Sequence, residues 1–224
     1  MQPFTINIHT HARLPGETAV VSHSLGIGEP LPESPFSAGI HPWDAAEVDV
    51  ASCLNELRRL PAAAVGEAGL DKLRGPALPV QEKILRRQLD IAAERRLPVI
   101  IHCVRAYNEL LETIKGYPGL RFIVHGFTGS PQTAGRITAA GGFLSFGFGF
   151  PRSPKTAESL RTTPADRLFF ESDTCTGPVT QVYEKAAAVR GETYESLVER
   201  VYCNYIEIFG LNGMEQPYRT AVRA

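Results

Sequence analysis

The chain lacks the features of secreted, membrane-spanning and polyanion-binding proteins. Its four cysteines lie at least 28 residues apart and form no C-x-x-C pair, which argues against a zinc knuckle or a redox motif. No apolar run nears the roughly 18 residues of a membrane span, and the N-terminus has no basic region or apolar run. A net charge of -1 provides no overall field that attracts nucleic acid or anionic lipid. These absences predict a reduced, cytoplasmic protein, and we expect a monomer without a membrane or an obligate protein partner.

The composition is that of a compact globular protein. Hydrophobic residues make up 43% and charged residues 21% of the 224 residues, which excludes extended disorder and a long coiled coil. Twenty glycines and 17 prolines imply many short connections. We expect one domain over residues 1–224, because no linker or internal repeat divides the chain.

Short apolar or β-branched runs alternate with stretches of helical period, which is typical of βαβ units around a parallel sheet. The clearest strands are expected at 5–9, 97–102, 120–125, 142–146 and 167–173, and weaker ones at 18–25, 36–41 and 62–66. Helices are expected at 47–60, 80–96, 106–116, 131–140, 154–162, 179–190 and 193–209. The alternation predicts a parallel α/β fold of barrel or doubly wound type.

Side chains that can bind a metal stand at the ends of five of these strands. Because the carboxyl ends of parallel strands form the face where sites are built, we expect these side chains to converge. Each of them alone has an ordinary explanation, either as a buried hydrogen-bonded residue or as a solvated one. They are His9, His11, Glu67, His102, His125 and Asp173.

Four histidines and two carboxylates exceed the ligand set of one tetrahedral ion, but they can divide between two ions bridged by a carboxylate. Two such ions generate hydroxide from water at neutral pH, so the sequence favours hydrolysis. The mixture of imidazole and carboxylate suits zinc, iron or manganese better than magnesium, which prefers oxygen ligands, and the identity of the two divalent ions stays open.

The chain resembles the TatD-type metal-dependent hydrolases of the amidohydrolase superfamily from residue 3 to about residue 211. The resemblance is carried by short motifs that occur in the order of the family. They are H-x-H at residues 9–11, G-I-H-P at 39–42, V-G-E-A-G-L-D at 65–71, an apolar strand that ends in His102, H-G-F-T-G at 125–129 and E-S-D at 171–173. The resemblance implies a TIM-like (β/α) barrel with a dinuclear metal site, and deoxyribonuclease or other phosphodiester cleavage.

The resemblance also implies roles for these residues. It places His9, His11, Glu67 and Asp173 around one ion and Glu67, His102 and His125 around the other, so that Glu67 bridges the two. Asp173 is implied as the general base or orienter of the attacking water. Asp173 and Glu67 are therefore the expected catalytic residues.

The sequence departs from the family pattern at a position that concerns substrate binding. The family's arginine two residues after the fifth-strand histidine is replaced by Val104, and Arg105 follows one place later. We therefore treat Arg105 as a substrate-binding candidate of uncertain register, together with His41. His41 is expected to contact substrate or to cap the following turn rather than to bind metal. Trp43 is expected either to pack or to stack on a base.

The segment between His11 and Gly39 is shorter than in the family and contains Pro15, Pro30, Pro32 and Pro35. A normal helix is not expected there, which allows for a barrel trimmed at its first βα units.

Three functions are compatible with this site. The leading hypothesis is hydrolysis of phosphodiesters, with DNA or a small phosphodiester as substrate. The second is an amide or ester hydrolase (deacylase), because the same activated water attacks a carbonyl. The third is a metal-binding module without catalysis. The sequence alone does not separate the first two.

Overall fold

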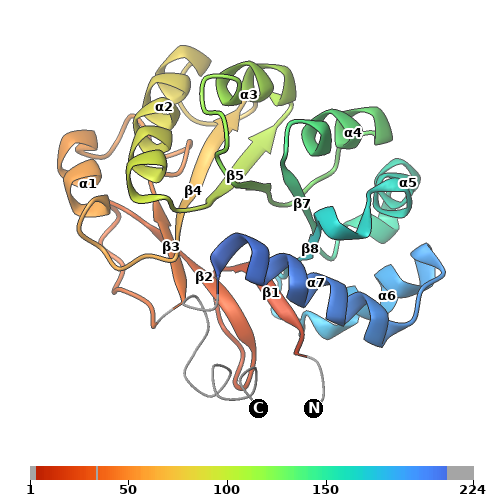
Figure 1. Cartoon of the computed structure of the whole chain (residues 1–224). Coiled ribbons are helices and arrows are strands. Elements are labelled where there is room, and N and C mark those ends of the chain that lie inside the picture. Colours follow the sequence, from red (N-terminus) through yellow and green to blue (C-terminus); the bar gives the residue numbers. More distant parts are fainter. Residues whose placement is uncertain (1–3, 34, 211–224) are drawn as a thin grey trace.

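The computed structural model describes residues 4–33 and 35–210, which form eight parallel strands in a nearly closed barrel with helices outside (Figure 1). Each strand pairs with its neighbour in the chain, in the order β1 to β8. Residues 1–3, 34 and 211–224, and with them both ends of the domain expected over 1–224, lie outside the described residues. The strands are β1 (Ile6–Thr10), β2 (Thr18–Ser24), β3 (Phe36–Gly39), β4 (Ala64–Asp71), β5 (Val99–Val104), β6 (Phe122–Val124), β7 (Phe143–Phe146) and β8 (Leu168–Phe170).

The expected α/β barrel is confirmed, and so is its trimmed beginning. Within the described residues no helix connects β1 to β2 or β2 to β3, whereas each later strand is followed by at least one helix. The prolines in these two connections remove backbone donors and restrict φ, which disfavours a helix. In the described part of the chain, no helix from these two connections therefore covers the outer side of β1 and β2.

The seven α-helices of the described residues match the expected stretches, except that α2 begins two residues before residue 80. They are α1 (Val50–Leu57), α2 (Leu78–Arg95), α3 (Tyr107–Ile114), α4 (Pro131–Ala139), α5 (Pro154–Thr162), α6 (Thr180–Arg190) and α7 (Tyr194–Phe209), and the short 3-10 turns η1 (Phe150–Arg152) and η2 (Ala165–Arg167) flank α5. Side chains of Asp49, Ser130 and Thr193 accept hydrogen bonds from the first turns of α1, α4 and α7. None of the helices in the described part of the chain has the length and apolarity that a bilayer span requires.

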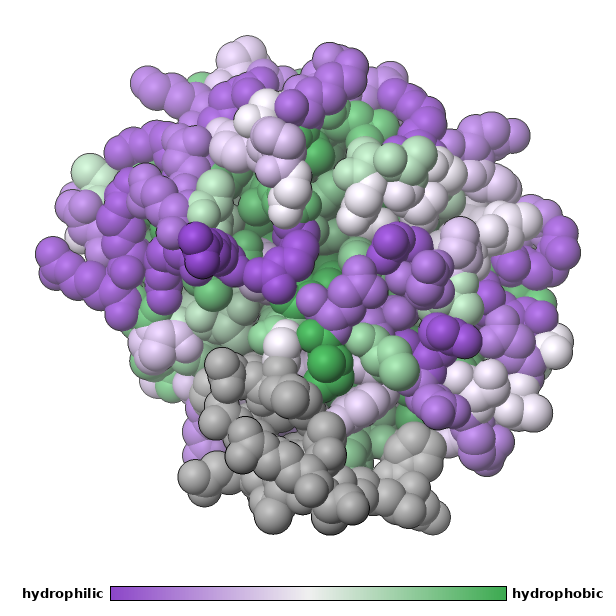
Figure 2. Space-filling view, in the orientation of Figure 1, coloured by the Kyte–Doolittle hydropathy of each residue, from purple (hydrophilic) through white to green (hydrophobic). Residues whose placement is uncertain are grey.

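Each helix turns an apolar side toward the strands and a polar side outward. Figure 2 shows hydrophilic side chains over most of the visible face and apolar ones in the gaps between helices. The core consists of side chains from the strands and the inner sides of the helices, among them Leu89, Phe122, Ile137 and Phe169, all fully buried. This packing holds the carboxyl ends of the strands in fixed positions around one face.

The strand expected at 62–66 is longer than the sequence analysis placed it. It continues as β4 through Glu67 to Asp71, so Glu67 lies inside the strand rather than after it. Its second half pairs closely with β5, with Gly69 opposite His102. A Cβ atom at Gly69 would overlap the carbonyl oxygen of His102, so the close approach depends on glycine. Gly69 thus lies inside the strand, where it permits the close pairing with β5.

The barrel closes between β1 and β8 through the backbone of residues expected in the site. His11 N donates to the carbonyl of Asp173 at 3.1 Å, and Asp173 N donates to the carbonyl of His9 at 3.1 Å. At the other end of β1, the hydroxyl of Tyr183 in α6 accepts from Ile6 N at 3.1 Å and donates to Ile6 O at 2.9 Å. The seam between first and last strands therefore runs directly beneath His9, His11 and Asp173.

Candidate metal centre

Five histidine side chains converge on the carboxylate of Glu67. Its Oε1 atom lies 2.7 Å from His102 Nδ1, 2.7 Å from His125 Nε2 and 3.1 Å from His41 Nε2. Its Oε2 atom lies 3.4 Å from His9 Nε2 and 3.6 Å from His11 Nε2. The two oxygens of Glu67 thus face two separate groups of imidazoles.

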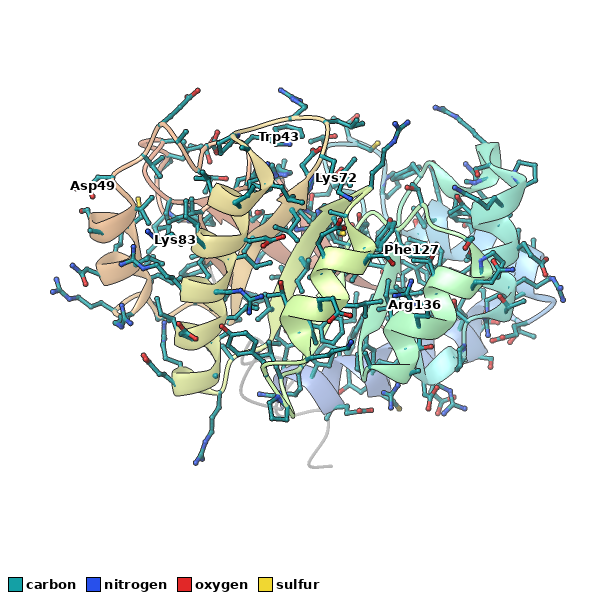
Figure 3. All side chains as sticks on the ribbon, turned by 90° about the horizontal axis from the view of Figure 1, so that it is seen from above. Trp43, Asp49, Lys72, Lys83, Phe127 and Arg136 are labelled. Carbon is teal, nitrogen blue, oxygen red and sulfur yellow. The ribbon has the colours of Figure 1, made fainter. Side chains whose placement is uncertain are left out.

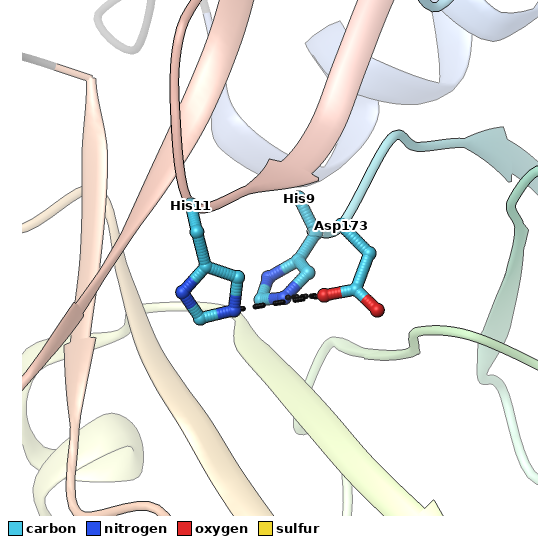
Figure 4. Close-up of side chains that lie close together, drawn as sticks. All are labelled: His9, His11 and Asp173. Carbon is cyan, nitrogen blue, oxygen red and sulfur yellow. Dashed lines mark ion pairs between the residues drawn. The ribbon is translucent and has the colours of Figure 1, made fainter. Parts of the chain in front are cut away.

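Asp173 lies beside the rings of His9 and His11 (Figure 4) and is one of the two most exposed side chains of the cluster. Its Oδ1 atom is 3.7 Å from His9 Nε2 and 3.6 Å from His11 Nε2. The side chains of Asp173 and His11 are 41% and 40% exposed, whereas those of His9 and Glu67 are 0% and 4% exposed. A small molecule can therefore reach the cluster beside Asp173 and not beside His9.

The outer hydrogen bonds of two histidines indicate which ring nitrogens carry protons. His102 Nε2 lies 3.2 Å from Asp71 Oδ2, and His125 Nδ1 lies 3.3 Å from Glu171 Oε1. If each outer nitrogen donates to its carboxylate, the inner nitrogen of the neutral ring points a lone pair at Glu67. This is the carboxylate–histidine arrangement that orients metal ligands.

His41 differs from these two rings because its outer nitrogen is an acceptor. Trp43 N donates to His41 Nδ1 at 3.1 Å, so the proton of the neutral ring is on Nε2 and is donated to Glu67 Oε1 at 3.1 Å. His41 is close enough to Glu67 and His102 to share an ion with them. The tautomer instead makes it a donor that positions Glu67 and caps the turn at Trp43.

The buried polar atoms of the cluster fit a bound cation. Both ring nitrogens of His9 are buried without a hydrogen-bond partner among the described residues. A carboxylate cannot use the inward lone pairs of neutral imidazoles, because it is itself only an acceptor. Three sets of residues have ligand atoms within 4.8 Å of one another: His9, His11 and Asp173; His9, Glu67 and His125; and His41, Glu67 and His102. Mixed imidazole and carboxylate donors suit divalent transition metals, so the residues fit such an ion.

The pKa shifts of His125 and Glu67 also indicate that the cluster favours a bound positive charge. Burial acts to lower the pKa of His125, but the carboxylates of Glu67 and Glu171 outweigh it and raise the pKa well above the usual 6.5. Burial acts to raise the pKa of Glu67, but the surrounding histidines hold it well below 4.5. A proton or a metal ion is thus favoured at the same place.

The structure brings together all six side chains that the sequence analysis proposed as metal ligands, and it adds two carboxylates. Asp71 and Glu171 were not proposed, although each stands in a quoted motif, four residues after Glu67 and two before Asp173. The sequence signal that could have identified them is their place at the ends of two strands. Asp71 is the last residue of β4, and Glu171 directly follows β8.

Arg105, proposed as a substrate-binding residue, lies outside the cluster. It directly follows β5, is exposed, and has a positive φ of 55°. Within the described residues its side chain has no hydrogen-bond or ion-pair partner. Its role in substrate binding stays a prediction.

Comparison with known proteins gives consistent matches. The family model described as TatD related DNase matches residues 21–210. The chain is 30% identical over 205 residues, 78% of each chain, to the 3'-5' ssDNA/RNA exonuclease TatD of Erwinia amylovora. It is 34% identical to the metal-dependent hydrolase YjjV of Escherichia coli K12 over 60% of this chain and 56% of that one. The crystal structure of YjjV superposes with a TM-score of 0.80 at 24% identity, covering 94% of this chain and 100% of that chain.

Proposed function

The chain belongs to the TatD-related DNase family, and we propose that it hydrolyses phosphodiester bonds in nucleic acid with two divalent metal ions. The observation that carries the proposal is the convergence of five imidazoles on Glu67, with Asp173 at the open side. This donor set is larger than one ion requires, and the two oxygens of Glu67 divide it.

The proposed ligand sets follow from which oxygen of Glu67 each histidine faces. His9, His11 and Asp173 would hold one ion with Glu67 Oε2, and His102 Nδ1 and His125 Nε2 would hold the other with Glu67 Oε1. Glu67 would bridge. Nitrogen-rich sites of this kind favour zinc, iron or manganese over magnesium.

When bound, the two ions would supply an acidified water and stabilise charge on the attacking and leaving oxygens. The protein residues supply the positioning. Burial acts to raise the pKa of Asp173, but the neighbouring imidazole of His9 lowers this pKa below 3.8. The carboxylate is therefore ionised at neutral pH and can accept a proton from water at the open side. His41 holds Glu67 in place by donating to Oε1.

Single-stranded nucleic acid is the proposed substrate class. The exonuclease from Erwinia amylovora is named for single-stranded DNA and RNA. The net charge of -1 gives no strong general attraction for long duplex, so substrate must be held by local contacts. A strand end presented to Asp173 fits this requirement better than an internal duplex site.

The test combines metal content with turnover. We expect about two ions per chain by elemental analysis and metal-dependent release of nucleotides from a single-stranded oligonucleotide. Asp173→Asn removes the proton acceptor and should lower kcat by roughly 10²- to 10⁴-fold. The exposed Asp90→Asn in α2 is the matched control and should behave as wild type.

The proposal fails if the metal-loaded protein leaves both oligonucleotides and a small activated phosphodiester uncut. A panel of acylated amines and esters should be assayed in parallel. Turnover confined to that panel would assign the same site to acyl transfer instead.

A further inference from the structure

Trp43 forms part of the rim of the metal centre. Its indole Nε1–H donates to Asp71 Oδ2 at 2.7 Å, and its ring is edge-to-face with His41 at 4.6 Å and with His102 at 5.6 Å between centroids. The ring is partly exposed. Figure 3 shows Trp43 and Lys72 toward the same end of the barrel. These contacts fix the plane of the indole next to the candidate ligands.

The guanidinium of Arg74 lies over this indole. Its Cζ atom is 3.5 Å from the ring centroid, a cation–π contact at stacking distance. The backbone of Arg74 is held by Asp71, which also holds the indole. Asp71 Oδ1 accepts from Leu73 N at 2.7 Å and from Arg74 N at 3.1 Å. Asp71 therefore orients His102, Trp43 and the loop that carries Arg74.

The guanidinium of Arg74 has its donors free. Among the described residues it has no hydrogen-bond or ion-pair partner, and the side chain is exposed. Stacking occupies a face of the guanidinium but not its edge, where five N–H groups point outward in the plane. A planar donor edge of this kind suits bidentate recognition of an oxyanion such as phosphate.

We propose that Arg74, held on Trp43, forms a subsite for the phosphate next to the one that is cleaved. The inference rests on the proposed function, which it extends to substrate binding. Arg74 makes no ion pair with any carboxylate of the described cluster, so it sits at the rim and not among the ligands. A substrate with one phosphate would contact the ligands alone, and a longer strand would also reach Arg74. Arg74 thereby provides the cation that Val104 cannot supply at the end of β5.

Binding can be measured without catalysis because Trp43 is the sole tryptophan of the chain. The probe is a thymidine trinucleotide with phosphorothioate linkages, titrated into the metal-loaded protein while tryptophan emission is recorded. We expect a saturable change in emission, with a Kd raised roughly 10- to 100-fold in Arg74→Ala. Arg74→Lys keeps the charge without the planar fork and should fall between. Arg87→Ala, an exposed arginine on α2, is the control for loss of charge and should match wild type.

Kinetics provide the second readout. We expect Arg74→Ala to lower the ratio of trinucleotide to bis(p-nitrophenyl) phosphate cleavage, measured as kcat/KM, by roughly 10- to 100-fold, mainly through KM. An equal Kd and an equal ratio in Arg74→Ala and wild type would overturn the subsite while leaving the proposed function intact. Emission that stays constant while anisotropy shows the trinucleotide binding would also overturn it. If wild type cleaves neither substrate, the proposed function itself is wrong.

Discussion

At the scale of single residues, the carboxylates behind the histidines decide which nitrogen faces the centre. Glu171 Oε1 accepts from Gly126 N at 2.8 Å and lies 3.3 Å from His125 Nδ1, and its side chain is almost fully buried. A proton held at Nδ1 leaves the Nε2 lone pair directed at Glu67. The proposed ligand role of His125 thus depends on Glu171, which is not itself a proposed ligand.

Glu171→Gln should therefore weaken metal binding without removing a ligand. Loss of the negative charge reduces the preference for Nδ1–H, and outer partners of this type contribute about 10- to 100-fold to metal affinity. Titration with a metal buffer, followed by elemental analysis, measures the change. Glu158→Gln, on the exposed side of α5, is the control. Equal affinities in the two variants would contradict this role of Glu171.

Residue types at strand ends predicted which side chains converge, because a buried histidine or aspartate after an apolar run needs a polar or charged partner. The partners Asp71 and Glu171 could not be predicted in the same way. Their function depends on which ring nitrogen each one faces, and that is set by the twist of β4 and by the irregular backbone after β8. The stacking of Arg74 on Trp43 is equally a product of two loops that meet only in the barrel.

At the scale of elements, the closeness of β4 and β5 sets the distance between Glu67 and His102. Gly69 permits this closeness, because a side chain there would overlap the His102 carbonyl. We expect Gly69→Ala to destabilise the fold by about 1–3 kcal/mol or more, as overpacking does, and to lower metal content. Urea unfolding of the metal-free protein measures the first effect.

Gly135→Ala provides the opposite expectation in the same assay. Gly135 lies in α4 with open space around its Cα, so an added methyl meets nothing. Alanine in a helix should stabilise the protein by roughly 0.5–1 kcal/mol. If both glycine variants changed stability alike, the close approach at Gly69 would not be the constraint that the structure indicates.

Periodicity predicted every helix and the missing helices near the prolines, since both follow from local backbone chemistry. The predicted extent of β4, residues 62–66, was wrong for a different reason. The apolar run that predicted this strand ends at Gly66, and only the pairing with β5 shows that the strand continues through Gly69 to Asp71.

At the scale of the whole molecule, the candidate metal centre and the closure of the barrel involve the same residues. The backbone of His9, His11 and Asp173 joins β1 to β8 directly below the side chains that would hold an ion. Any ligand that binds only the folded state stabilises it, by about 2.7 kcal/mol at 100 times Kd. Bound metal ions should therefore stabilise the junction between β1 and β8, and their removal by a chelator should lower Tm.

The size of this effect should depend on pH in a direction fixed by the pKa values. The pKa of His125 is raised above 6.5, so its contribution to metal-free stability is complete below pH 6.5 and is lost as pH rises through the folded value. The pKa of Glu67 is lowered below 4.5, so its contribution is present above pH 4.5 and is lost as pH falls through the folded value. The metal-free protein should thus be most stable in the mildly acidic range between these limits.

Metal binding releases the protons that the histidines hold, so it strengthens as pH rises. The difference in Tm between loaded and chelated protein should therefore be smallest near pH 5.5 and should widen through pH 7 to pH 8.5. Calorimetry at these three pH values, with and without a chelator, measures it. The same series on Glu67→Gln should show a small difference at every pH, because the residue shared by both groups of histidines is lost. A difference in wild type that stays constant with pH would mean that ions do not replace protons in this cluster.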